Sequence, residues 1–257
     1  MKKLSKKELK AFLDEKAAFY ETPDFLETDP IHIPAQFSLK QDIEISGFLT
    51  ASIAWGNRKS IIKNAHKLME IMGHSPYDFV MNYHEDHQDK LEGFVHRTFN
   101  STDLDFFIKG LQNLYTHFQS MEDFYVQYQD MERINDAIPH FKNYFFSIPH
   151  PARTQKHVSD PSKKSAAKRI NMFFRWMVRN NKQGVDFGIW KQIQASQLSC
   201  PLDVHSGNVA RKLGILLRKQ NDAKALLELD TALRKMDPYD PVKYDFALFG
   251  LGVFEKF

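Results

Sequence analysis

The sequence contains few of the residues that build cross-linked or turn-rich folds. It has a single cysteine, Cys200, among 257 residues, which excludes an internal disulfide and a four-cysteine metal or iron–sulfur site. The 11 glycines and 11 prolines are few for a sandwich or barrel and suit long helices. No stretch approaches the roughly 20 apolar residues of a membrane-spanning helix. Since the basic start of the chain also lacks the apolar core of a signal peptide, we expect a reduced, soluble, cytoplasmic protein without a membrane partner.

The charge balance is mildly basic, with 35 lysines and arginines against 32 acidic residues, a formal charge of +3 and a pI near 8.7. This balance is weak evidence for nucleic-acid binding, so the positions of the basic residues matter more than their number. The hydrophobic fraction of 42% is typical of a folded protein, and the 22 phenylalanines indicate packing between helices. The length suffices for one large domain or for two smaller units that share a cleft.

Helical periodicity runs through most of the chain, and cap residues mark its ends. Ser5 and Glu8 form the capping-box pattern of a first helix, and Gly56 with Asn57 has the chemistry of a helix C-terminus. The pattern predicts helices over residues 5–20, 42–57, 58–73, 165–184 and 203–214, with two more that start at Asp222 and Asp240. Residues 22–34 and 147–164 are expected to be irregular, and no β-hairpin is expected. The fold class is therefore all-α.

The helix that contains Lys168 has a cationic face. On a helical wheel with 100 degrees per residue, three further cations fall within about 40 degrees of Lys168. They are Arg175, Arg179 and Lys182. Lys163, Lys164 and Arg169 add positive charge near its start, and the opposite face is apolar. Such a row is a plausible track for a phosphate backbone, although the same row also fits an ordinary solvated helix face.

A carboxylate is expected at the start of another helix, in the turn Pro201–His205. Asp203 is the predicted N-cap, where it can accept backbone N–H bonds. A fixed carboxylate suits a reaction that builds positive charge, such as the departure of a base from deoxyribose. The alternative is that Asp203 is only a cap. His205 and Arg211 on the same helix could reach a phosphate or be solvated.

Three segments together resemble the helix-hairpin-helix DNA glycosylases. LDVHSGNVARKLG, which contains Asp203, resembles the catalytic-aspartate segment of endonuclease III and its relatives. SAAKRINMFFRWM resembles the segment of the nucleophilic lysine, which Lys168 would supply. FLTASIAWGNRKSIIKNAHKLM resembles the early helix-turn-helix whose tip wedges into DNA, and Asn57 or Arg58 would occupy that tip.

As a whole the chain resembles an uncharacterised bacterial family that is distantly related to the archaeal 8-oxoguanine DNA glycosylase branch. The shared segments correspond to residues 165–179, 201–205 and 240–248. The resemblance implies two helical subdomains that flank a cleft, within one unit over 1–257. A central subdomain with a degenerate hairpin would span about 41–185, and a second would combine about 1–40 with 186–257.

The resemblance further implies a base-excision repair enzyme of the cytoplasm and nucleoid, which acts as a monomer on double-stranded DNA with a damaged base. It would be a bifunctional N-glycosylase and β-lyase that removes 8-oxoguanine through a Schiff base on Lys168, with Asp203 stabilising the charge on the sugar. No cofactor, metal or iron–sulfur cluster is expected. The expected DNA contacts are Asn57, Arg58, Lys163, Lys164, Ser165, Arg169, Arg175, Arg179, His205 and Arg211. The conceivable walls of the base pocket are Trp55, Phe173, Trp176 and Trp190, each of which also fits the core.

Two alternatives stay open. The hairpin of typical members reads L-P-G-V-G, whose glycines let backbone amides approach a phosphate, whereas residues 162–167 contain no glycine. The chain could therefore be a non-catalytic DNA-binding protein of the same fold. A metal-dependent hydrolase is the second alternative, because His84-Glu85-Asp86-His87 places two histidines beside two carboxylates, although not at an established ligand spacing.

Overall fold

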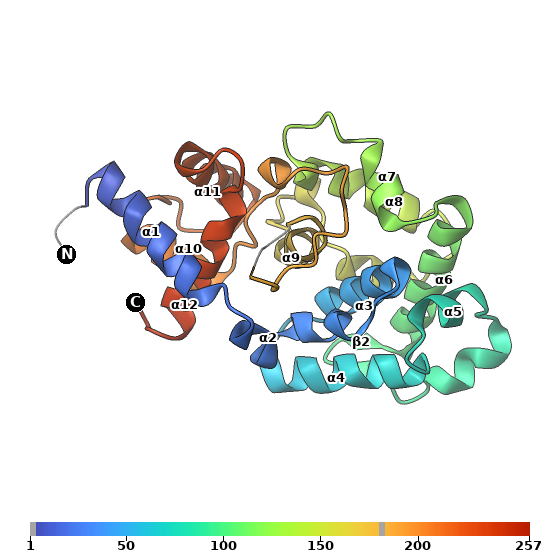
Figure 1. The fold of residues 1–257 in the computed structure, drawn as a ribbon. Helices are drawn as coiled ribbons and strands as arrows, with labels where there is room; N and C mark the ends of the chain where they lie inside the picture. Colours follow the sequence, from blue (N-terminus) through green and yellow to red (C-terminus); the bar gives the residue numbers. More distant parts are fainter. Residues whose placement is uncertain (1–3, 180–182) are drawn as a thin grey trace.

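The computed structural model describes residues 4–179 and 183–257, so Lys182 of the predicted cationic face lies outside it. The described chain is mostly helical, which confirms the predicted class at that level (Figure 1). Its α-helices are α1 (Lys6–Tyr20), α2 (Asp24–Thr28), α3 (Lys40–Ser52), α4 (Arg58–Ile71), α5 (Pro76–Met81), α6 (Ser101–His117), α7 (Met121–Val126), α8 (Ile138–Phe145), α9 (Lys168–Val178), α10 (Val204–Lys212), α11 (Ala223–Met236) and α12 (Tyr244–Val253).

Short 3₁₀ helices fill many of the connections. They are η1 (Pro30–His32), η2 (Pro34–Gln36), η3 (Glu85–Leu91), η4 (Ile134–Ala137), η5 (Ala152–His157), η6 (Pro161–Lys163), η7 (Ala195–Gln197) and η8 (Pro241–Lys243).

A small antiparallel hairpin, β1 (Val95–His96) and β2 (Phe99–Asn100), is present where no hairpin was expected. Its two-residue loop is Arg97–Thr98, and Arg97 has a φ of +55°. Loops of this length usually carry glycine or asparagine at positions with positive φ. Because Arg97 takes the place of glycine or asparagine, the sequence does not show the usual signal for this hairpin.

The apolar residues form two separate clusters. The larger one collects side chains from α3 to α9, and the smaller one joins α1 to α10, α11 and α12. Figure 1 shows this second group, with the first helix lying beside helices from the end of the chain. Phe25, Ile31 and Ile33, which precede residue 41, also pack in the larger cluster.

Helix α3 runs through the larger cluster, and every residue from Ile43 to Ser52 is buried. Its Glu44 carboxylate accepts hydrogen bonds from Tyr115 Oη (2.8 Å), the Met121 backbone N–H (2.9 Å) and Trp190 Nε1 (2.6 Å). Burial raises the pKa of Glu44. Trp190 is thereby a core residue that satisfies a buried carboxylate.

Phe173 and Trp176 of α9 are also fully enclosed by protein. Phe173 packs edge-to-face against Phe48 and Trp190, with ring centroids 5.8 and 5.5 Å away. The suggestion that Phe173, Trp176 and Trp190 form walls of a base pocket is therefore wrong, since none of the three lines the large cavity described below.

Helix α9 begins at Lys168 and ends at Val178. For two of the cations predicted on its face, neither a phosphate track nor the alternative of a solvated face agrees with the structure. Arg175 and Arg179 are only 3% and 5% exposed. Arg175 pairs with Asp186 (3.2 Å) and Asp245 (2.5 Å). Arg179 pairs with Asp186 (3.1 Å), Asp240 (2.8 Å) and Glu21. These carboxylates come from the end of α1, the segment after α9 and residues 240–245, so the two arginines join α9 to other elements and are not a track for phosphate.

Candidate functional site

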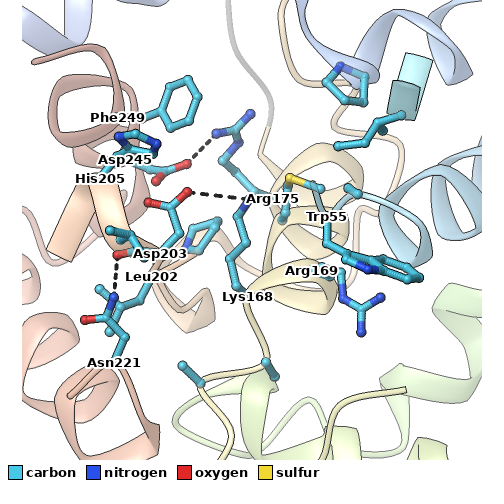
Figure 2. Close-up of a pocket in the computed structure, with 18 of the residues that line it drawn as sticks. Trp55, Lys168, Arg169, Arg175, Leu202, Asp203, His205, Asn221, Asp245 and Phe249 are labelled. Atoms are coloured by element: carbon cyan, nitrogen blue, oxygen red, sulfur yellow. Dashed lines mark hydrogen bonds and ion pairs between the residues drawn. The ribbon is translucent and has the colours of Figure 1, made fainter. Parts of the chain in front are cut away.

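A cavity of about 730 Å³ lies where the two clusters meet. Its wall is built by the α3–α4 turn, the segment around Asp29, the start of α9, the start of α10 and the inner face of α12. Figure 2 shows how the side chains from these elements converge. The size is in the range of small-molecule and nucleobase pockets.

Lys168 is the first residue of α9, and its side chain extends across the cavity toward α10 (Figure 2). Its Nζ lies 3.6 Å from Oδ2 of Asp203, with the two side chains 31% and 19% exposed. The two residues are 35 positions apart in the chain (203 minus 168). The fold therefore brings an amine and a carboxylate into one partly enclosed space.

Asp203 is the N-cap of α10, as its sequence context predicted. Its Oδ1 accepts hydrogen bonds from the Ser206 backbone N–H (3.0 Å) and from Ser206 Oγ (3.2 Å), and Ser206 Oγ in turn accepts one from the Asp203 N–H (2.9 Å). Asn221 Nδ2 donates to the Asp203 carbonyl (2.7 Å). One carboxylate oxygen is thus fixed by the helix start, while the other faces Lys168.

The wall next to Lys168 carries a stacked cation. The Arg169 guanidinium lies 4.7 Å from the centre of the Trp55 ring and donates to the carbonyls of Ser52 and His157 (3.2 Å to His157). No carboxylate pairs with it among the residues that the structure describes. Burial lowers the pKa of Arg169 to about 10, so the group stays cationic at neutral pH. Trp55 is half-buried and lines the cavity, which makes it a rigid aromatic surface there.

The opposite wall comes from α12. The guanidinium of Arg58 lies 5.3 Å from the centre of the Phe249 ring, and both residues line the cavity. Asp245 is buried beside Arg175, and burial raises its pKa against the opposing effect of that arginine. Sequence reasoning did not single out Asp245 or Phe249. An acidic residue within the apolar run of residues 244–251 was the available signal for Asp245.

The turn before α9 is built without glycine but has left-handed backbone. Lys164 has a φ of +71° and Ala167 a φ of +45°. The turn is held from outside, because the Lys164 carbonyl accepts from the Ala223 N–H (3.0 Å) and Ser165 forms a β-bridge with Asp222. Without glycine this turn is more strained, but it still adopts the left-handed backbone conformation.

The expected site residues fall into three groups. Those that line the cavity are Trp55, Arg58, Ser165, Lys168, Arg169, Arg175, Asp203 and His205, with Arg175 held in its buried ion pairs. Those at the surface outside it are Asn57, Lys163 and Lys164. Those occupied by other contacts or in the core are Phe173, Trp176, Arg179, Trp190 and Arg211, the last of which donates to the Arg218 carbonyl and to Asn221.

The His84–His87 segment is separate from this cavity. The His84 side chain is 59% exposed and lies 3.5 Å from Asp86, which is 93% exposed. Within residues 4–179 and 183–257, no group of three histidine, cysteine or acidic side chains is arranged to hold a metal ion. In the same part of the chain, none of the helices has the length and apolar character needed to cross a membrane.

The fold and the site define a mostly helical protein whose central cavity contains a lysine–aspartate pair between an aromatic wall and several arginines. Residues 29–254 match the family described as "Protein of unknown function (DUF2400)", and the chain belongs to this family. No curated protein and no solved structure matches the chain.

Proposed function

We propose that this protein is a DNA glycosylase with lyase activity, which removes an oxidised purine such as 8-oxoguanine from double-stranded DNA and acts as a monomer in the cytoplasm and nucleoid. The observation that carries the proposal is the approach of Lys168 Nζ to Asp203 Oδ2 at 3.6 Å inside one cavity. An amine nucleophile beside a fixed carboxylate is the pair that glycosidic-bond cleavage through a Schiff base requires. The sequence resemblance to helix-hairpin-helix glycosylases assigns these roles to the same two residues.

In the proposed reaction, the unprotonated amine of Lys168 attacks C1′ of the deoxyribose while the bond from C1′ to the base breaks. The base leaves with the bonding electrons and takes up a proton, and Asp203 stabilises the positive charge that develops on the sugar. Opening of the sugar ring then gives a Schiff base between Nζ and C1′. Loss of a C2′ proton and departure of the 3′ phosphate complete β-elimination, and water releases Lys168.

The surroundings of the pair fit an extruded nucleotide. A base needs an aromatic or apolar wall, and its phosphates need cations at the mouth of the cavity. Trp55 and Phe249 line the cavity, each with an arginine against its ring. Arg58 and Arg169 line that cavity, and Lys163 and Lys164 lie exposed in the turn before α9. Lysine side chains at this turn would replace the glycine amides that hold phosphate in typical relatives.

The test is borohydride trapping on duplex DNA that contains 8-oxoguanine or an abasic site. We expect a covalent adduct and strand cleavage with the unmodified protein and neither with Lys168→Gln. The matched control is Lys224→Gln, because Lys224 is an exposed lysine in the first turn of α11 and does not line the cavity. The control should trap DNA at the normal yield.

A non-catalytic DNA-binding protein is the second candidate, favoured by the strained, glycine-free turn around Lys164. This candidate predicts tight, salt-dependent binding to duplex DNA with no adduct on either substrate. Trapping that persists at full yield in Lys168→Gln would contradict the catalytic proposal, since the amine that forms the Schiff base would then lie elsewhere.

A further inference from the structure

The β1–β2 hairpin presents an exposed arginine at the edge of the cavity. Arg97 is the first residue of its loop, and the guanidinium packs against the backbone of Gly56. A Cβ atom at Gly56 would lie 2.8 Å from Arg97 Nη1 and 3.1 Å from its Cδ. Since Gly56 lines the cavity and precedes the Asn57–Arg58 tip, Arg97 lies beside the same rim.

The hairpin is held rigidly on the molecule. Asn64 Nδ2 donates to His96 Nδ1 (2.9 Å), so His96 carries its proton on Nε2 and donates to the Trp55 carbonyl (3.1 Å). Arg153 donates to the Thr98 carbonyl (2.9 Å) and to Asn100 Oδ1 (2.8 Å). His96 is buried, and burial lowers its pKa, with Arg97 and Arg169 acting in the same direction. These contacts fix the loop relative to Trp55.

Arg97 packs on Gly56, but no polar contact within the described part of the chain gives it a structural role. Within residues 4–179 and 183–257, its guanidinium has no hydrogen-bond or ion-pair partner. Arg97 also has a φ of +55°, a conformation that costs an arginine energy and that glycine or asparagine adopts more readily. Strain at an exposed charged residue beside a cavity indicates a functional demand.

We propose that Arg97 is a DNA-backbone contact, and that the β1–β2 hairpin docks on the duplex next to the Gly56–Arg58 turn. The inference rests on the proposed function, because it takes the cavity as the place of the extruded nucleotide. Arg97 beside Gly56 and Arg58 within the turn then give this rim two cations. The phosphodiester chain, which carries one charge per nucleotide, is the partner of matching chemistry.

The test compares Arg97→Asn with the unmodified protein in binding to a duplex that contains a tetrahydrofuran abasic analogue, over a range of KCl concentrations. The slope of log K against log[KCl] is negative, and removal of one phosphate contact should make it less steep by about 0.9 and weaken binding roughly fivefold at 0.1 M salt. Because asparagine tolerates positive φ, the melting temperature should stay the same or rise by up to about 4 °C. A merely structural arginine would give the opposite sign in the thermal experiment.

Lys256→Asn is the matched control, since Lys256 is an exposed cation with a φ of +52° that does not line the cavity. It should leave the salt slope unchanged. An unchanged slope in Arg97→Asn, or a lower melting temperature, would overturn the assignment of Arg97 while DNA binding and trapping through Lys168 persist. Absence of DNA binding by the unmodified protein would overturn the proposed function and this inference together.

Discussion

The two carboxylate oxygens of Asp203 have different roles, one in capping α10 and one in facing Lys168. The variant Asp203→Asn separates these two roles. Oδ1 caps α10 through Ser206 at 3.0 and 3.2 Å, whereas Oδ2 faces Lys168 Nζ at 3.6 Å. Asparagine caps helices about as well as aspartate. The ion pair with Lys168 is partly exposed and contributes less than about 1 kcal/mol. We therefore expect the free energy of unfolding to fall by less than about 1 kcal/mol, and the rate of base release to fall by roughly 100- to 1000-fold.

The assay pairs urea unfolding, followed by circular dichroism, with single-turnover base release from an 8-oxoguanine duplex. Asp203→Ala is the comparison, because it removes the cap as well and should cost about 1 kcal/mol more in stability. Two results would refute the reasoning. One is a rate for Asp203→Asn near that of the unmodified protein, and the other is a stability loss equal to that of Asp203→Ala.

Three further predictions concern the surroundings of the site. Lys164→Gly should raise the free energy of unfolding by about 1 kcal/mol, because Lys164 has a φ of +71°, whereas Lys163→Gly should not; chemical denaturation of both variants decides. Arg175→Met should lower the free energy of unfolding by about 3–5 kcal/mol, since it leaves Asp186 buried without one of its two cations. Because burial raises the pKa of Asp186 to about 6, the loss should be smaller at pH 5 than at pH 8. Urea titrations at the two pH values that show no such loss would contradict the assigned ion pairs. His157 is buried, and burial lowers its pKa to about 4. Between pH 6.5 and 4 the unfolded chain therefore takes up a proton that the folded chain does not. The free energy of unfolding should fall by up to about 3 kcal/mol as the pH is lowered through this range. His157→Asn should remove this part of the pH dependence in unfolding measurements from pH 7 to 4.5.

The positions of Lys168 and Asp203 at helix starts could be predicted because their signals are local. The Asp203–Ser206 capping box and the polar turn before Lys168 need only neighbouring residues to be read. That the two helix starts meet in one cavity came from the resemblance and not from periodicity. A helix pattern fixes which residues share a face and says nothing about which helix lies opposite.

The burial of Arg175 and Arg179 could not be predicted for the same reason. A helical wheel places both on the face of Lys168. Of the carboxylates that neutralise them, Asp186 follows within 11 residues, but Glu21, Asp240 and Asp245 lie far away in the sequence. Only the tertiary fold shows that this face meets protein.

The β1–β2 hairpin was missed for another reason. Its turn places Arg97 at a position of positive φ, where the usual glycine or asparagine signal is absent.

The positions of the tryptophans could not be predicted from the sequence either. Trp55 lines the cavity and Trp190 lies in the core, although both occur in similar apolar contexts.

The most direct test of the central claim is to locate the covalent bond. The protein would be trapped with borohydride on abasic duplex DNA, digested, and sequenced by tandem mass spectrometry. We expect the reduced sugar to be attached to Nζ of Lys168. Attachment to a different amine, such as that of Lys164, or the absence of any adduct on DNA that the protein binds, would contradict it.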